Sequence, residues 1–383
     1  MKTEPVAVVR CDRYEIKPVR AALEQMIGLC GALTELQPGM RVGIKANLVA
    51  AGKPETAITT HPVVLAALTE LLVERGCSVV VGDSGGGPWT AAHMHHIYSV
   101  SGMKAVEAAG GSLNEDFGER EAAFLEAVQA KTIRYTSWVD ACDVLINVSK
   151  VKSHGMMALS NAVKNLFGLV PGVLKPEYHF RYPNPNDFAD MILDIGAFRK
   201  PILHIADGIV AMQGNGPTRG TPYPLGVLLM SKNPHLLDLA AARMLGLSVD
   251  DIPTLQAAKR RGLLPENEAD LSVTGDGADV KAESFERILN RNSTLFSETD
   301  TAFGRLQRRF LTMALGTKPV VKKAECVGCR HCAEICPAKA ISMRGGIPVI
   351  DRKKCIRCFC CQEFCPKGAM KAHRSPIAKL INH

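Results

Sequence analysis

The chain has 383 residues, 46% of them hydrophobic, and a formal net charge of +8 at pH 7. This length suffices for one large domain plus a small module, and the lack of any run of about 18 apolar residues argues against a transmembrane helix. Thirteen cysteines without a signal segment after Met1 predict a reducing cytoplasm and not a disulfide-stapled secreted domain, and 5% aromatic residues without a basic face argue against nucleic-acid binding.

The first 280 residues alternate between strand and helix patterns. The expected strands span 6–10, 41–47, 78–83, 143–149, 202–207 and 225–231. The expected helices span 19–36, 62–75, 99–109, 159–169 and 234–245, followed by a polar, less regular region over 251–300. Strands that alternate with helices indicate parallel βαβ units, so the sequence predicts an α/β fold with a mostly parallel sheet and flanking helices.

Polar side chains stand at or just after the ends of four of these predicted strands. They are Lys45, Asn47, Asp83, Ser84, Lys150, Lys152, His154 and Asp207. Open parallel sheets bind ligands at the carboxyl ends of their strands, so these residues would face one crevice if the four strands are parallel. Each residue taken alone also fits an ordinary polar loop.

The segment 149–172 adds further basic and amide side chains, because Asn161, Lys164 and Asn165 fall at helical spacing and share one face. Several ammonium groups there would hold a carboxylate or a phosphate, and a desolvated lysine can act as an acid. Glycine-rich loops at 85–88 and 214–220 would allow backbone amides to approach an anion, although neither matches a nucleotide-binding pattern. A solvated basic turn is the alternative.

Three histidines and a tyrosine-rich segment are weaker candidates. His93, His95 and His96 could bind a metal or relay protons, although a surface loop explains them as well. The segment 178–182 is expected to be a loop that could cover the crevice.

Two cysteine runs near the C-terminus share the spacing C-x2-C-x2-C-x3-C-P, which is typical of a module that holds two 4Fe–4S clusters. The first three cysteines of a run bind one cluster and the fourth binds the other. We therefore assign one cluster to Cys326, Cys329, Cys332 and Cys365, and the second to Cys355, Cys358, Cys361 and Cys336. Cys360 is outside this register and is expected to be a packed thiol; the alternative is that it replaces Cys361 as a ligand.

These patterns resemble known families. Residues 319–373 resemble bacterial two-cluster ferredoxins, which implies a small α+β ferredoxin-like module. The elements K-A-N-L, T-T-H-P, G-D-S, S-K-V-K-S-H, N-A-V-K-N-L-F-G and A-D-G-I resemble, in this order, the family called domain of unknown function 362 over residues 5–280. The lysine- and histidine-rich segment is faintly similar to the nickel-pincer lactate racemase family, but the full set of ligand histidines is missing.

The predicted domains are an α/β domain over 1–298 that binds a substrate or a partner, a connecting helix over 299–318, and the ferredoxin-like domain over 319–383. The leading hypothesis is a cytoplasmic, anaerobic iron–sulfur oxidoreductase that passes electrons to a small anionic, unsaturated substrate. The candidate catalytic residues are Lys45, Asp83, Lys152 and His154; the candidate substrate-binding residues are Asn47, Ser84, Lys150, Lys164, Asn165 and Asp207. Reduced ferredoxin or a similar low-potential donor would supply the electrons, and the oligomeric state is open, a homodimer included.

Two other hypotheses fit the same sequence. The chain could be an electron-transfer protein whose α/β domain docks a redox partner and has no substrate of its own. It could also be a metal-dependent isomerase or lyase in which the clusters are structural.

Overall fold

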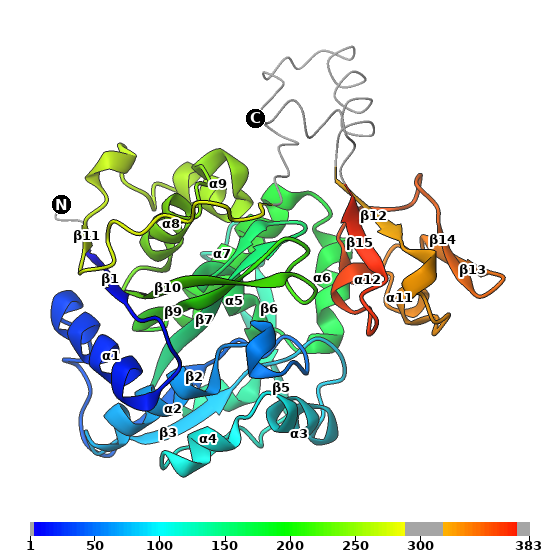
Figure 1. The fold of residues 1–383 in the computed structure, drawn as a ribbon. Coiled ribbons are helices and arrows are strands. Elements are labelled where there is room, and N and C mark those ends of the chain that lie inside the picture. Colours follow the sequence, from blue (N-terminus) through cyan, green and yellow to red (C-terminus); the bar gives the residue numbers. More distant parts are fainter. Residues whose placement is uncertain (1–3, 288–316, 374–383) are drawn as a thin grey trace.

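The computed structural model describes residues 4–287 and 317–373. Within these residues a nine-stranded sheet forms the centre of the α/β domain, in the order β11-β1-β10-β9-β7-β2-β3-β4 with β8 beside β7 (Figure 1). The strands are β1 Val6–Arg10, β2 Arg41–Lys45, β3 Ser78–Gly82, β4 Ser112–Leu113, β7 Val144–His154, β8 Ala158–Ser160, β9 Leu203–Gln213, β10 Thr221–Ser231 and β11 Val273–Thr274.

The strands β9, β7, β2 and β3 are parallel neighbours, which confirms the predicted parallel core of the sheet. Their central residues are buried, as expected for strands that are covered on both faces. Strand β10 runs antiparallel to both β9 and β1, so the sheet is mixed. The connection from β9 to β10 is too short for a parallel crossover, which needs about a dozen residues.

Helices cover both faces of this sheet. Alternate residues of β1 point to opposite sides, so Ala7 and Val9 pack in the same core cluster as Val19 and Leu23 of α1. Val6 and Val8 lie instead in the core cluster on the other face, which α8 helps to form. The helices are α1 Ile16–Cys30, α2 Pro62–Val73, α3 Ala91–Val100, α4 Lys104–Ala108, α5 Ala162–Asn165, α6 Lys175–Arg181, α7 Pro185–Arg199, α8 Pro234–Met244 and α9 Pro253–Arg260.

Several predicted helices have different bounds in the structure. The predicted helix 99–109 is two helices, α3 and α4, and Gly102 lies between them with a positive φ of 74°. The predicted helix 159–169 contains the end of β8, the short helix α5 and a 3₁₀ turn over Leu166–Leu169. The segment 178–182, expected to be a loop, is mostly helix α6, and the three clustered histidines lie on α3.

The cysteine-rich segment forms a small module of short strands and helices. Strand β12 (Lys318–Val321) pairs with β15 (Met370–His373), and β13 (Ile341–Arg344) pairs with β14 (Ile347–Ile350) through a tight turn. Two one-turn helices, α11 (His331–Glu334) and α12 (Cys360–Glu363), complete the module (Figure 1).

The predicted connecting helix lies mostly outside the described residues, and the predicted domain boundaries stay predictions. In the described ranges, none of the helices combines the length and the hydrophobicity needed to cross a bilayer.

Candidate functional site

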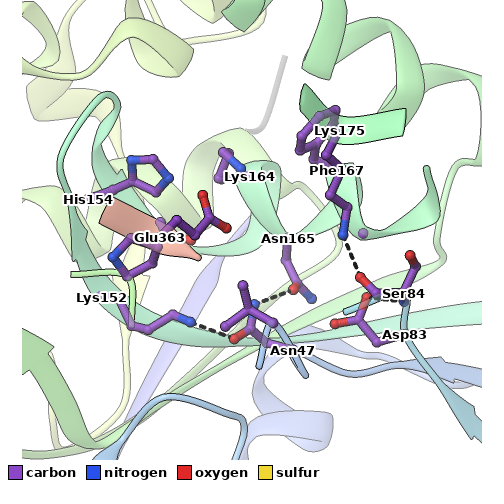
Figure 2. Close-up of a pocket in the computed structure, with 14 residues that line it drawn as sticks. Asn47, Asp83, Ser84, Lys152, His154, Lys164, Asn165, Phe167, Lys175 and Glu363 are labelled. Atoms are coloured by element: carbon purple, nitrogen blue, oxygen red, sulfur yellow. Dashed lines mark hydrogen bonds between the residues drawn. The ribbon is translucent and has the colours of Figure 1, made fainter. Parts of the chain in front are cut away.

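A pocket opens where β2, β3 and β7 end, at the edge of the sheet that the strand-end rule predicts. Its cavity volume is about 40 Å³, which exceeds the ~10–15 Å³ that one water needs and suits a group of a few heavy atoms. The pocket is lined by Asn47, Val49, Asp83, Ser84, Lys152, His154, Ser160, Lys164, Asn165, Phe167, Gly168, Lys175, Pro217 and Glu363 (Figure 2). Seven of the ten candidate residues from the sequence line this pocket.

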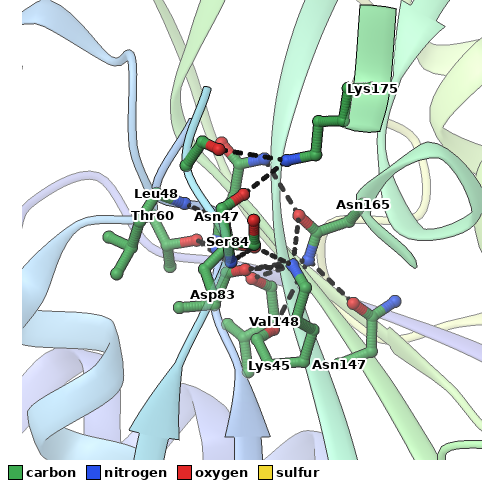
Figure 3. A network of polar contacts seen from close by, with 12 residues as sticks. Lys45, Asn47, Leu48, Thr60, Asp83, Ser84, Asn147, Val148, Asn165 and Lys175 are labelled. Carbon is green, nitrogen blue, oxygen red and sulfur yellow. Dashed lines mark hydrogen bonds and ion pairs between the residues drawn. The ribbon is translucent and has the colours of Figure 1, made fainter. Parts of the chain in front are cut away.

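Lys45 and Asp83 form a buried ion pair at the back of this pocket. Lys45 Nζ lies 2.7 Å from Asp83 Oδ1, and the other carboxylate oxygen of Asp83 accepts a hydrogen bond from the Leu48 amide at 2.5 Å. The Ser84 amide also donates to Asp83 at 2.7 Å (Figure 3). Asp83 is therefore fully engaged in joining the ends of β2 and β3, and the structure favours a positioning role for this pair over catalysis.

Gly168 allows the chain to pass directly over this ion pair. A Cβ atom at Gly168 would lie 2.2 Å from Asp83 Oδ1 and 2.5 Å from Lys45 Nζ. Real Cβ contacts are not this short, so a side chain at this position would displace the pair or the 3₁₀ turn that carries Gly168.

A chain of amide side chains runs along the floor of the pocket. Asn47 Nδ2 donates to Asn165 Oδ1 at 2.9 Å, and Asn165 Nδ2 donates to Asn147 Oδ1 at 2.8 Å (Figure 3). Asn147 Nδ2 continues the chain to His204 Nδ1 at 3.0 Å. Because every amide in this chain has its partners, Asn47 and Asn165 are fixed in orientation and set the shape of the floor.

Lys152 lies on the wall formed by β7 and is buried. Its ammonium group donates to Asn47 Oδ1 at 2.6 Å and to the Ile58 carbonyl at 2.8 Å. Burial, which penalises the charged form, lowers the pKa of Lys152 to about 7. A lysine with this pKa can both hold an anion and release a proton near neutral pH.

Lys164 and Lys175 supply two further ammonium groups. Lys164 Nζ lies 4.7 Å from the centre of the Phe167 ring, and burial lowers its pKa. Lys175 donates to the carbonyl groups of Ser84 and Gly85, and burial lowers its pKa to about 8. Sequence analysis missed Lys175, although it follows closely on the basic segment 149–172. In the described parts of the chain, neither ammonium group forms an ion pair with a carboxylate.

His154 and Ser84 also line the pocket, and each has a buried polar atom without a partner among the described residues. These atoms are His154 Nε2 and Ser84 Oγ. The other ring nitrogen of His154 accepts hydrogen bonds from two backbone amides, those of Met156 at 3.1 Å and Met157 at 3.2 Å.

Lys150 and Asp207 do not line this pocket, contrary to the expectation that they bind substrate. Lys150 Nζ lies 2.8 Å from Asp207 Oδ2 and 2.7 Å from the hydroxyl of Tyr14. Tyr14 in turn stacks on the ring of His61, with 3.6 Å between the ring centres. The register between β7 and β9 shifts between Lys150 and Lys152, and the two lysines have different partners. The Lys150–Asp207 pair is a buried structural contact.

The cluster module contributes one residue to the pocket, Glu363 at the end of helix α12. Figure 2 shows its side chain among those of Lys152, His154 and Lys164. The carboxylate of Glu363 acts electrostatically on Lys152, Lys164 and Lys175 and favours their charged forms. The sequence places Glu363 two residues after Cys361, but this spacing does not reveal that the helix faces another domain.

The loop 214–220, predicted to bind an anion, instead forms hydrogen bonds with helix α12 and the residues that follow it. Gln362 donates to Asn215 Oδ1 at 2.9 Å, and Thr218 donates to the Glu363 carbonyl at 3.0 Å. Arg219 donates to the carbonyl of Cys365 at 2.9 Å. The carbonyl groups and side chains of this loop thus hold the cluster module against the pocket.

The glycine loop 85–88 also serves close packing. A Cβ atom at Gly86 would lie 2.4 Å from the ring of Phe364, which follows α12, and one at Gly172 would lie 2.2 Å from the Gly85 carbonyl. Small residues in this loop therefore let the cluster module and the 3₁₀ turn at Gly172 approach the end of β3.

The cysteines assigned to each cluster lie near one another in the module, and their division into two ligand sets stays a prediction. Burial and the nearby thiols of Cys365, Cys329 and Cys326 raise the pKa of Cys332 to about 11. Burial and the nearby thiols of Cys358, Cys355, Cys336 and Cys332 raise the pKa of Cys361 well above its usual value. Iron cations would offset this repulsion between thiolates, so both quartets suit an iron–sulfur cluster. Cys360 is fully buried, close to Cys358 and Lys164.

Comparisons with known proteins agree with this two-part organisation. Residues 42–243 match the family described as Domain of unknown function (DUF362), and residues 318–366 match the 4Fe-4S dicluster domain. The first match covers more than half of the chain, so the chain belongs to the DUF362 family and carries a ferredoxin-type iron–sulfur domain. This confirms the two family resemblances that the sequence motifs indicated.

Among curated proteins, the thylakoid-associated protein sll1697 of Synechocystis sp. is 32% identical over 267 residues, which cover 68% of this chain and 80% of the relative. Among solved structures, the lactate racemase apoprotein of Thermoanaerobacterium thermosaccharolyticum matches with a TM-score of 0.39 and 10% identity. That match covers 63% of this chain and 56% of the racemase.

Proposed function

We propose that this member of the DUF362 family is an iron–sulfur oxidoreductase that reduces a small anionic, unsaturated organic substrate in the lysine-lined pocket. One observation carries the proposal: the one-turn helix α12 contains Cys361, assigned to a cluster, and Glu363, which lines the pocket. A protein that only carried electrons would gain nothing from placing a cluster-binding helix in the wall of a cationic pocket.

The charges of the pocket favour an anion. Lys152, Lys164 and Lys175 oppose one nearby carboxylate, that of Glu363, because Asp83 is paired with Lys45. The pocket thus retains an excess of ammonium groups, which an anionic substrate would balance. A cavity of about 40 Å³ can enclose a carboxylate group and the first atoms of its carbon chain, and it is far too small for a nucleotide.

Two 4Fe–4S clusters, when bound, supply electrons one at a time. Reduction of a carbon–carbon double bond consumes two electrons and two protons and yields a CH–CH single bond. A reduced ferredoxin or a similar low-potential donor supplies the electrons, and the cytoplasm is the compartment that we propose. Lys152 is well placed to give one proton, since its pKa near 7 lets it be protonated before the step and neutral after it.

The decisive experiment is anaerobic. The holoprotein is reduced with a low-potential donor, and reoxidation of its clusters is followed against a panel of short unsaturated carboxylates. We expect saturable reoxidation by one class of compound, and we expect Lys152→Ala to abolish the saturation while the iron content stays the same. Lys104→Ala is the matched control, because Lys104 is exposed on α4.

Reoxidation by redox proteins alone, with no response to any carboxylate, would overturn the proposal. That result would favour an electron-transfer protein whose α/β domain docks a partner.

A further inference from the structure

His154 ends strand β7 and begins the turn that leads into β8. Its Nδ1 atom accepts hydrogen bonds from the Met156 amide at 3.1 Å and the Met157 amide at 3.2 Å. A neutral imidazole carries a single N–H, so a ring whose Nδ1 accepts must carry its hydrogen on Nε2. The backbone of the turn therefore selects the tautomer of His154.

The N–H at Nε2 has no acceptor. His154 is 2% exposed, and its Nε2 atom has no hydrogen-bond partner in the described parts of the chain. A buried donor without a partner destabilises a protein, so such atoms call for an explanation. The residue lines the pocket, which has room for a small ligand.

A second proton cannot easily be added to this ring. Burial lowers the pKa of His154 well below 6.5, and the nearby charge of Lys164 lowers it further. The ring therefore stays neutral over the physiological pH range. The N–H of a neutral imidazole is a very weak acid, so His154 is suited to donating a hydrogen bond and unsuited to the proton transfer that the sequence suggested.

We propose that His154 binds a carbonyl oxygen of the substrate through its fixed Nε2–H, so that the substrate is an anion whose double bond is conjugated to a ketone-type carbonyl group. This inference rests on the proposed function. The anionic end lies against the lysines, and the hydroxyl of Ser84, which also lacks a partner in the described residues, is a second donor facing the same cavity.

A donor at this place has a chemical purpose. When the first electron adds to a conjugated double bond, negative charge develops on the carbonyl oxygen, and a preorganised N–H stabilises that charge. The second electron and two protons complete the CH–CH bond, with the electrons taken from the reduced iron–sulfur clusters and the protons from ammonium groups of the pocket. His154 keeps its hydrogen throughout, so it is unchanged at the end of the reaction.

Two variants of His154 separate the roles of its two ring nitrogens, Nδ1 as an acceptor and Nε2 as a donor. In His154→Asn, the side-chain oxygen can still accept from the turn amides, as Nδ1 does, but nothing replaces the N–H at Nε2. In His154→Gln, the longer amide can place an N–H near the position of Nε2, while the acceptor for the turn is lost.

The measurement is anaerobic calorimetry on the oxidised holoprotein with 4-oxopent-2-enoate and with pent-2-enoate, which lacks the ketone. We expect the wild type to prefer the ketone-bearing anion, and His154→Asn to bind it about 10-fold more weakly with little change for pent-2-enoate. His154→Gln should retain most of the preference but unfold at a lower temperature.

Equal affinities of the wild type and His154→Asn for both anions would overturn the role of His154 and leave the proposed function intact. Failure of both anions to bind to the wild type would overturn the inference together with the proposed function.

Discussion

The lysines around this edge of the sheet fall into two groups that the sequence does not distinguish. Lys45 and Lys150 each contact a buried carboxylate, that of Asp83 or Asp207. Lys152, Lys164 and Lys175 face the pocket, and none of them forms an ion pair with a carboxylate in the described ranges. Lysines that lie close together are therefore structural in the first group, where each has a carboxylate partner, and available to a ligand in the second, where no carboxylate pairs with them.

The largest effect is expected from breaking a pair of the first group. Lys45→Met would leave the Asp83 carboxylate buried without its counter-charge, and breaking a buried pair costs about 3–5 kcal/mol. The free energy of unfolding, followed by the fluorescence of the two tryptophans in the α/β domain, checks this. A cost under about 1 kcal/mol would show that Lys45 belongs with the pocket lysines.

A lysine of the second group should show the opposite pattern. Lys164 has no hydrogen-bond partner in the described parts of the chain to leave unsatisfied and contacts only the rings of Phe167 and Phe188, so Lys164→Met should cost no more than about 1 kcal/mol. A charge-assisted contact to an anion contributes about 1.5–3 kcal/mol, so binding of a short carboxylate should weaken by about 10- to 100-fold. Calorimetry tests the loss of anion binding, and thermal unfolding of the same preparation tests the stability. A large loss of stability would contradict the division of the lysines into a structural group and a pocket group.

The first group can also be disturbed without changing a charge. Gly168→Ala forces a methyl group onto the Lys45–Asp83 pair, and overpacking of this kind costs about 1–3 kcal/mol. The matched control is Gly28→Ala, because a Cβ atom at Gly28, in helix α1, meets no other atom within 4 Å. Denaturation curves of the two variants should differ clearly, and similar curves would mean that the turn at Gly168 yields.

The pH dependence of anion binding distinguishes the groups in the wild type. The pKa of Lys152 is about 7 and that of Lys175 about 8, so both are charged below pH 7 and lose their charge as the pH rises through this range. We expect the affinity for a carboxylate to fall by about tenfold or more between pH 6.5 and pH 9. Calorimetric titrations across this range measure it, and a flat profile would indicate that other groups bind the anion.

The smallest effect is expected at the cluster module. Glu363→Gln removes the one carboxylate that the module brings to the pocket lysines, so anion affinity should rise a few-fold, because the opposing charge is partly exposed. Glu334→Gln on α11 is the control, since that side chain is largely exposed. A loss of affinity in Glu363→Gln would show that Glu363 supports the bound anion instead of competing with it.

The core of the fold could be read from the sequence. Short hydrophobic stretches over 41–47, 78–83 and 143–149 predict buried strands, and the strand-end rule then brings Asn47, Asp83 and Lys152 to one edge. The structure confirms these strands and the edge that they share. Strands of this kind can be predicted because hydrophobic patterns depend only on residues that are close in the sequence. The cysteine quartets are equally local, since their spacing alone restricts how they can fold around a cluster.

Other features depend on contacts between distant segments. The pairing of Lys150 with Asp207 follows from the register of β7 against β9, which shifts next to this pair. The position of Glu363 follows from docking of α12 on the loop 214–220, across more than 140 residues of sequence. Helices α6 and α7 were missed although each has a proline in its first turn, a start signal that they share with the predicted helices α2 and α8.

The hydrogen bonds between the loop 214–220 and helix α12 limit the exchange of the cluster module for another one. A ferredoxin module from another protein could be grafted after residue 316 and would bring its own clusters, but it would lack the counterparts of Gln362, Glu363 and Phe364 that fit the loop and the pocket. A chimera of this kind should carry electrons while its pocket stays open on one side. The cluster module of this protein is therefore not interchangeable with another ferredoxin module, because the single helical turn α12 also completes the pocket.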